Sequence, residues 1–187
     1  MKLIKTTLLV TMMSSLLCAE TPKNSVLESV VNDGTQATQT LLQTLQSHMQ
    51  EHMKKGGVMD ALDFCSTQAY ALTDEVNSKL PNGISAKRIT LKTRNLANEP
   101  QTDESKVLKD LESKKELSPY VVEKVDAHTY KFYKPLVIDK PLCLKCHGEI
   151  STDKNLQSAI NEKYPNDKAI NYKMGDLRGA VVVTIKK

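Results

Sequence analysis

Residues 130–147, Tyr-Lys-Phe-Tyr-Lys-Pro-Leu-Val-Ile-Asp-Lys-Pro-Leu-Cys-Leu-Lys-Cys-His, join two patterns that decide the fold class. The first half alternates, and its apolar side chains fall on one face of a β-strand: Tyr130, Phe132, Leu136 and Ile138. The second half, Cys143-Leu144-Lys145-Cys146-His147, has the spacing of a c-type haem attachment sequence. Small cytochromes c are all-helical and lack such a strand. The stretch therefore predicts a haem protein built around a β-sheet.

The spacing of the Cys-Leu-Lys-Cys-His motif has a chemical reason. Cys143 and Cys146 lie on one turn, where each thiol can form a thioether to a haem vinyl group, and His147 can place its imidazole under the iron. The alternatives are a zinc site and a redox-active Cys-x-x-Cys pair. A closed zinc site needs four ligands, but the other cysteines, Cys18 and Cys65, do not form a second pair. We therefore expect one haem c, held covalently through Cys143 and Cys146 with His147 as an iron ligand.

Residues 1–19 have the composition of a secretory signal peptide. Lys2 and Lys5 precede an apolar stretch, residues 8–17, that is too short to span a bilayer, and Ala19 offers a small residue for cleavage. A retained membrane anchor and a lipidated Cys18 are the alternatives. Because c-type haem is attached outside the cytoplasm, we expect an exported, periplasmic protein without stable membrane insertion after cleavage.

Charge and composition limit the partners of the mature chain. Removal of residues 1–19 takes away two lysines and no acidic residue, so the formal net charge falls from +4 to +2. Nucleic-acid binding requires a concentrated basic surface, and we expect no nucleic-acid partner. The chain has no Trp and two Phe, a shortage of aromatic bulk that a buried haem would fill. Since no repeat or long linker divides residues 20–187, we expect them to form a single domain.

Two helices are expected before the first strand. Apolar residues recur at helical spacing over residues 26–55, and Gly56-Gly57 ends this helix. A second helix, residues 58–79, ends at the turn Pro81-Asn82-Gly83. Steps of three and four along the second helix define an inward face: Leu62, Cys65, Ala69, Leu72 and Val76.

The remaining chain alternates strands with short helices. We expect strands over residues 84–93, 120–125, 130–138 and 179–185. Polar helices are expected over residues 102–115, with Thr102 as the cap, and over residues 155–164. Asp126-Ala127-His128 makes a hairpin connection between the second and third strands. Helices followed by strands in this order predict an α+β fold with a central antiparallel sheet.

Four blocks of sequence occur in a distinctive order: residues 61–66 with their internal cysteine, residues 84–98, residues 141–148, and the closing segment 164–180. This ordered set resembles a bacterial family of single-haem c-type domains of uncharacterised function, found alone in the periplasm or as the sensing part of membrane signalling proteins. The resemblance covers most of residues 20–187. It implies a PAS-like fold in which N-terminal helices pack on the sheet and one haem is bound covalently.

The second axial ligand of the iron has several candidates. Met174 would raise the reduction potential, as in electron carriers, but methionine also fills gaps in closing loops. His48, His52 and His128 carry imidazoles, although exposed positions on a helix and in a turn explain all three. An unpaired Cys65 is ordinarily a small apolar core residue. The family resemblance implies instead that the Cys65 thiol reaches the iron, where a thiolate would lower the reduction potential.

Arg88 and Arg94 are the candidate partners of the haem propionates. A guanidinium matches a carboxylate through two parallel hydrogen bonds, and both arginines lie in or beside the strand that follows the Cys65 helix. Exposed strand charges are the alternative for each. Arg178 is a third candidate, and we expect Lys145 to be solvated.

Three functional classes are consistent with one haem: electron transfer, redox or gas sensing, and catalysis such as that of a peroxidase. Catalysis needs an open iron face with a distal acid or base, and the sequence has no distinct motif for one. We expect a redox-active haem protein that acts in electron transfer or in sensing, without substrate turnover. A His/Met-ligated electron carrier and a peroxidase-like enzyme are the alternatives. The expected partner is an unidentified redox or signalling protein.

Overall fold

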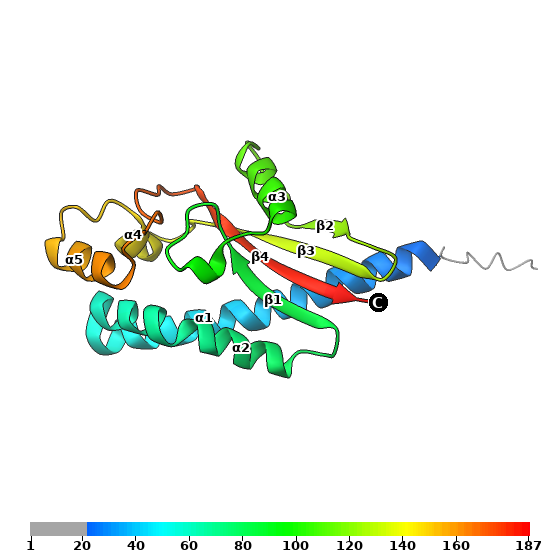
Figure 1. Ribbon diagram of the computed structural model, residues 1–187, viewed down its shortest axis with the longest axis horizontal. Coiled ribbons are helices and arrows are strands. Elements are labelled where there is room, and N and C mark those ends of the chain that lie inside the picture. The colour runs from blue at the N-terminus through cyan, green and yellow to red at the C-terminus, as the bar shows by residue number, and fades with distance from the viewer. Residues whose placement is uncertain (1–21) are drawn as a thin grey trace, which may run out of the picture.

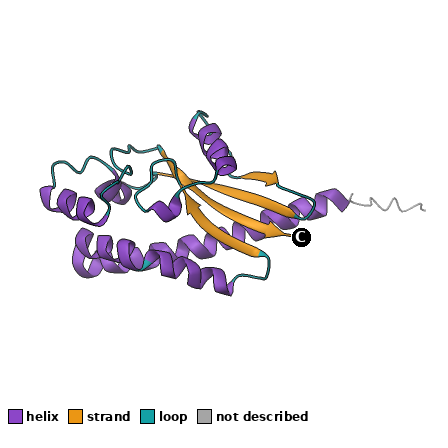
Figure 2. Ribbon diagram, in the orientation of Figure 1, coloured by secondary structure: helices purple, strands orange, loops and turns teal. Residues whose placement is uncertain are grey.

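The fold is organised by a four-stranded antiparallel sheet with the order β1-β4-β3-β2 (Figure 2). The computed structural model describes residues 22–187, so the expected signal peptide lies outside the described residues. The strands are β1 (Ile84–Ile89), β2 (Val121–Lys124), β3 (Thr129–Val137) and β4 (Leu177–Lys186). All four strands expected from the sequence are present. Strand β1 is shorter than expected because Thr90 leaves the ladder, where its amide donates to the Asn98 carbonyl at 3.1 Å.

Strand β4 supplies the centre of the sheet and of two cores. Val181, Val183 and Ile185 pack on the side of helices α1 and α2, together with Phe132 of β3. Ala180 and Val182 point to the opposite face, toward helix α3. Because successive side chains of a strand alternate between faces, one valine-rich strand builds both cores.

Helix α1 (Pro22–Thr67) runs along one face of the sheet, and α2 (Ala69–Lys79) folds back along it (Figure 1). The expected break at Gly56-Gly57 is confirmed, since Gly57 has φ 71° and ψ −155°, outside the helical region. The second expected helix is interrupted at Gln68, so its last part is the separate helix α2. Gly34 lets α1 approach the sheet closely, because a β-carbon there would lie 2.7 Å from the Phe132 β-carbon.

Helix α3 (Thr102–Glu112) lies on the other face of the sheet (Figure 1). The expected cap, Thr102, is wrong, because Gln101 is the N-cap residue. The backbone amide of Gln101 donates to Glu104 Oε2 at 2.9 Å. The Glu104 carboxylate also accepts from Lys87 and Lys131 Nζ at 2.9 and 3.1 Å, although Glu104 is 1% exposed. This ion cluster fixes α3 to strands β1 and β3.

Two short helices, α4 (Pro141–His147) and α5 (Lys154–Lys163), lie beyond the end of the sheet, beside the C-terminal part of α1 (Figure 1). Leu156 and Ile160 of α5 pack against Leu62 of α1, and Asp153 caps α5 by accepting from the Leu156 amide at 3.0 Å. None of the helices within residues 22–187 combines the length and apolar character that a membrane crossing requires. The α+β class, with helices packed on an antiparallel sheet, is confirmed.

Candidate functional site

A cavity of about 330 Å³ lies between the second half of α1, strand β1, the end of β3 and helix α4. All six site residues expected from the sequence line it: Cys65, Arg88, Arg94, Cys143, Cys146 and His147. Most of the other lining side chains are apolar: Leu42, Leu45, Met49, Met53, Ala61, Leu62, Phe64, Ala69, Leu136, Val137, Ile138 and Leu142. An apolar cavity with a few convergent polar groups is the usual form of a cofactor site.

Helix α4 carries both motif cysteines into this cavity. Pro141 begins the helix, and the Gly148 amide closes it by donating to the Leu144 carbonyl at 2.9 Å. The Cys143 and Cys146 side chains are half-buried, and neither forms a disulfide. Burial raises the pKa of the Cys146 thiol, an effect that the nearby Arg94 guanidinium opposes. One helical turn therefore presents two free thiols to the same apolar space.

His147 is held as one tautomer. Its Nδ1 lies 2.8 Å from the Ala169 carbonyl oxygen, and because a carbonyl oxygen only accepts, Nδ1 carries the proton. This leaves Nε2 as the unprotonated nitrogen. Burial, with Arg178 and Arg94 nearby, lowers the pKa of His147 to about 3, so the imidazole is neutral at neutral pH. A neutral imidazole with Nδ1 bonded to a carbonyl is the form in which histidine binds iron.

Arg94 ties the haem-type motif to the closing loop. Its Nη2 donates to the Cys146 carbonyl at 2.8 Å and to the Ala169 carbonyl at 3.2 Å. Asp167 Oδ2 accepts from Arg94 Nε and Nη2 at 3.1 and 2.8 Å. The pair is buried, with 9% and 4% of the two side chains exposed. Both Nε and Nη2 of Arg94 therefore donate to protein acceptors. The expected contact of Arg94 with a haem propionate stays a prediction.

Arg88 has a different environment. Its Nε atom is buried and has no hydrogen-bond partner within the described part of the chain. Burial lowers the pKa of Arg88, while the nearby Cys65 and Tyr164 act in the opposite direction. A buried cationic donor without an acceptor is costly, and this one lines the cavity. The site therefore fits an anionic group, such as a carboxylate, beside Arg88.

Cys65 does not point into the packed core, so that expectation is wrong. Phe64, its neighbour, is 2% exposed and takes the core position, whereas Cys65 is exposed and lines the cavity. The Cys65 residue is exposed because it borders the cavity, yet protein surrounds its thiol on the other sides. This partial burial raises the pKa of the Cys65 thiol. Arg88 and Arg94 are close enough to oppose that rise in the pKa of Cys65. The sulfur faces the same space as the motif cysteines and His147.

The other ligand candidates lie away from the cavity lining. Met174 is 50% exposed in the loop before β4. His48 is exposed and stacks on Phe64, and His52 Nδ1 lies 3.0 Å from Asp60 Oδ2. His128 is exposed in the β2–β3 turn. Within residues 22–187, no group of three or more His, Cys, Asp or Glu side chains is placed to hold a metal ion.

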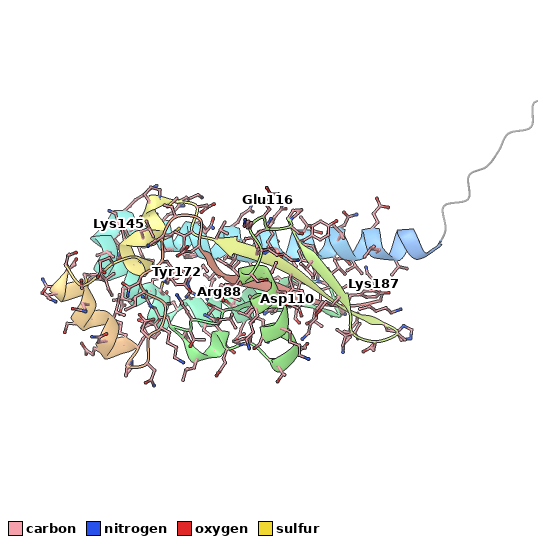
Figure 3. The ribbon with its side chains drawn as sticks, turned by 90° about the horizontal axis from the view of Figure 1, so that it is seen from above. Arg88, Asp110, Glu116, Lys145, Tyr172 and Lys187 are labelled. Carbon is pink, nitrogen blue, oxygen red and sulfur yellow. The ribbon has the colours of Figure 1, made fainter. Side chains whose placement is uncertain are left out.

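The remaining basic candidates, Arg178 and Lys145, differ in their surroundings. Arg178 lines the cavity, donates from Nη1 to Thr90 Oγ1 at 2.7 Å and lies over the Tyr172 ring. Lys145 is exposed, as expected, and lies at the same end of the molecule as Tyr172 (Figure 3).

Two comparisons with known proteins gave a match. The Tll0287-like family matches residues 23–186. The chain belongs to this family. A crystal structure of the cyanobacterial haem protein Tll0287 has the same fold, with a TM-score of 0.62 and 24% sequence identity over 90% of this chain and 98% of that chain. Comparison with curated proteins gave no match. The single-haem family resemblance read from the sequence is confirmed as membership of the Tll0287-like family.

Several residues that line or support the cavity were not predicted from the sequence. Met49 and Met53 of α1, Asn95 and Asn98 beside the short helix η1 (Leu96–Asn98), and Tyr164 all line the cavity. Asp167 and Ala169 lie behind it and hold Arg94 and His147. The methionines sit at helical spacing, which indicated a buried face but not its occupant. No local signal pairs Arg94 with an aspartate in the closing segment.

Proposed function

We propose that this protein binds one haem c in the cavity and acts as a redox-active haem protein. The observation that carries the proposal is the convergence of four groups on one apolar cavity. They are the two motif thiols, the His147 imidazole with Nε2 unprotonated, and the Arg88 guanidinium, whose buried Nε has no hydrogen-bond partner among residues 22–187. Each matches one requirement of a covalently held haem, which needs two thiols, an axial nitrogen and a partner for a propionate. The family relative Tll0287, itself a haem protein, supports the same cofactor.

The residues have distinct roles in this proposal. Cys143 and Cys146 hold the haem through thioethers, and His147 binds its iron through Nε2. Arg88 pairs with a propionate, and Cys65 supplies the second axial ligand. When bound, the haem supplies a one-electron centre. The apolar lining excludes water from that centre, and a thiolate ligand stabilises the ferric state, so the reduction potential is low.

Cys65 is a better second ligand than Met174 because Cys65 lines the cavity and Met174 does not. If His147 and Cys65 both held the haem iron, no coordination position would be left for a substrate. This arrangement favours electron transfer or ligand-exchange sensing over a peroxidase-like activity. In a sensor, release of Cys65 on reduction would change the contacts of α1 and supply two conformational states.

We further propose that the protein is exported to the periplasm. The signal-like composition of residues 1–19 and the need to attach c-type haem outside the cytoplasm support a periplasmic protein. A redox or signalling protein is the proposed partner. We also propose that the domain is PAS-like, which is supported by the helices that cover an antiparallel sheet and by the cavity at one side of that sheet.

Covalent attachment is tested by the double variant Cys143→Ala/Cys146→Ala, produced in a periplasmic host that matures c-type haem. The wild-type protein should stain for haem on a denaturing gel, and the double variant should not. Cys65→Ala is the matched control, because it removes a cavity thiol outside the motif and should keep the covalent stain. Equal staining of the wild type and the double variant would refute attachment through these cysteines.

The second axial ligand is tested by electron paramagnetic resonance of the ferric protein. Cys65→Ala should abolish a low-spin thiolate signal while the haem stays attached. Met174→Ala, which changes an exposed side chain outside the cavity lining, should leave the spectrum unchanged. The opposite result, sensitivity to Met174 and indifference to Cys65, would make the protein a His/Met-ligated electron carrier.

A further inference from the structure

One backbone oxygen, that of Ala169, receives two donors from different parts of the fold. His147 Nδ1 donates to it at 2.8 Å, and Arg94 Nη2 donates to it at 3.2 Å. Ala169 is fully buried, so water does not compete for this oxygen. The carbonyl that orients the His147 ring is therefore shared with a guanidinium cation.

The position of this carbonyl is set by an ion pair. Asp167 Oδ1 accepts from the Ala169 amide at 2.8 Å, while Asp167 Oδ2 accepts from Arg94. The Lys168 amide donates to the Thr93 carbonyl at 2.8 Å, which fixes the loop to the segment that carries Arg94. These hydrogen bonds hold residues 167–169 in place and restrict rotation of the Ala169 carbonyl.

Arg94 also reaches the motif itself. Its Nη2 donates to the Cys146 carbonyl at 2.8 Å, one residue before His147. One guanidinium thus contacts both the backbone next to His147 and the carbonyl that accepts the hydrogen bond from its imidazole. Arg94 and Asp167 are together buried enough that solvent screens them weakly.

We propose that Arg94, with Asp167, is the positioning residue for the His147 axial ligand, acting through the shared Ala169 carbonyl. The inference rests on the proposed function, because it requires His147 to bind iron. Two effects follow from the geometry. The clamp fixes the rotation of the imidazole ring, and the second, cationic donor withdraws electron density from the carbonyl oxygen, which weakens its hold on the Nδ1 proton. Outer hydrogen bonds of this kind control the orientation and basicity of a ligating histidine.

The test compares three variants of the full haem-loaded protein. Arg94→Lys keeps the charge but loses the planar fork that reaches Asp167 and two carbonyls. Asp167→Asn keeps the shape and removes the ion pair. Lys145→Gln is the control, since it removes a positive charge from an exposed position inside the motif. Covalent haem content is measured first, followed by the ferric electron paramagnetic resonance g values and the midpoint potential.

The positioning role predicts that Arg94→Lys and Asp167→Asn both shift the g values, while Lys145→Gln leaves them unchanged. Arg94→Lys should also lower the midpoint potential, because the Ala169 carbonyl then accepts from His147 alone. A purely electrostatic role of the ion pair predicts unchanged g values in both variants. It also predicts an unchanged midpoint potential for Arg94→Lys and a raised midpoint potential for Asp167→Asn. That result would overturn the inference.

Two further outcomes keep the test decisive. Breaking a buried ion pair costs stability, so if Asp167→Asn does not fold, the charge-conserving Arg94→Lys decides alone. Wild-type protein without covalent haem would overturn the proposed function and this inference with it. Covalently loaded wild type with variant spectra identical to it would overturn only the role of Arg94.

Discussion

Replacement of Glu104 by glutamine should strongly destabilise the fold. Glu104 is 1% exposed, and its carboxylate accepts from the Gln101 amide, Lys87 Nζ and Lys131 Nζ. Glutamine has nearly the same shape, but its amide group offers two donors and one acceptor where three donors converge. Lys131, which is 8% exposed, loses its buried anionic partner. The variant therefore removes charge with little change in volume.

The size of the effect follows from the burial of the partners. Removing one member of a buried ion pair costs about 3–5 kcal/mol. The loss is smaller here, because glutamine still accepts one hydrogen bond and Lys87, with 41% of its side chain exposed, regains water. We expect the free energy of unfolding at pH 7 to fall by roughly 2–4 kcal/mol.

The pH dependence has a definite sign. Burial raises the pKa of Glu104, but the hydrogen bonds from Gln101, Lys87 and Lys131 outweigh it, so the net pKa is lowered. A carboxylate with a lowered folded-state pKa stabilises the fold fully above its unfolded pKa, about 4.3, and loses this contribution as the pH falls through the folded value. The difference in unfolding free energy between wild type and Glu104→Gln should therefore be largest at pH 7 and should decrease at acid pH.

Urea unfolding at pH 7 and at acid pH measures both effects. Asp103→Asn is the matched control, since Asp103 Oδ2 also lies 2.6 Å from Lys131 Nζ but its side chain is 52% exposed. A carboxylate that stays half-exposed to water contributes about 0–1 kcal/mol through an ion pair, and Glu104 still neutralises Lys131 in this variant, so the control should change the unfolding free energy little. Equal losses for Glu104→Gln and Asp103→Asn at pH 7, or a Glu104→Gln loss that persists unchanged in acid, would refute the reasoning.

Two further predictions concern the sheet. Gly34→Ala should cost about 1–3 kcal/mol of unfolding free energy, because the added methyl group overlaps the Phe132 ring; Gln39→Ala on an exposed position of the same helix is the control, and an equal effect of both would contradict the close approach. Burial and the nearby Glu123 raise the pKa of Tyr133, whose hydroxyl donates to Glu123 Oε2 at 3.1 Å. Because the pKa of Tyr133 is higher in the folded than in the unfolded state, stability falls as the pH rises above the unfolded value of about 10. Denaturation curves at alkaline pH should therefore show a loss of unfolding free energy for wild type that Tyr133→Phe lacks.

Short-range patterns predicted the secondary structure well. The Gly56-Gly57 break, the alternation in β3 and the valines of β4 each follow from residues close together in the sequence. Errors arose where a tertiary contact decides the local structure. Thr102 has the ordinary residue type of a helix cap, but Gln101 takes that place because Glu104 is also held by Lys87 and Lys131.

The sequence predicted several of the residues that line the cavity, but not the hydrogen bonds that hold them. The motif identified Cys143, Cys146 and His147, and family resemblance added Cys65, all of which line one cavity. Helical periodicity alone placed Cys65 in the core, because it does not distinguish a face packed on protein from a face that borders a cavity. The contact between Arg94 and Asp167 joins two loops from distant parts of the sequence, and no spacing rule reports it.

The central place of β4 has a consequence for the kinetics of folding. Its partners are β1 and β3, with Ile185 opposite both Ile84 and Tyr130, so the outer strand β1 gains no strand partner until residues 84–89 and 177–186, far apart in the sequence, meet. Contacts of such long sequence separation form slowly, because loop closure precedes any gain from pairing. We therefore expect the helices, whose contacts are local, to form before the sheet closes. Cys143 and Cys146 lie between β3 and β4 in the chain, so we expect their thiols to stay open to solvent until β4 has paired.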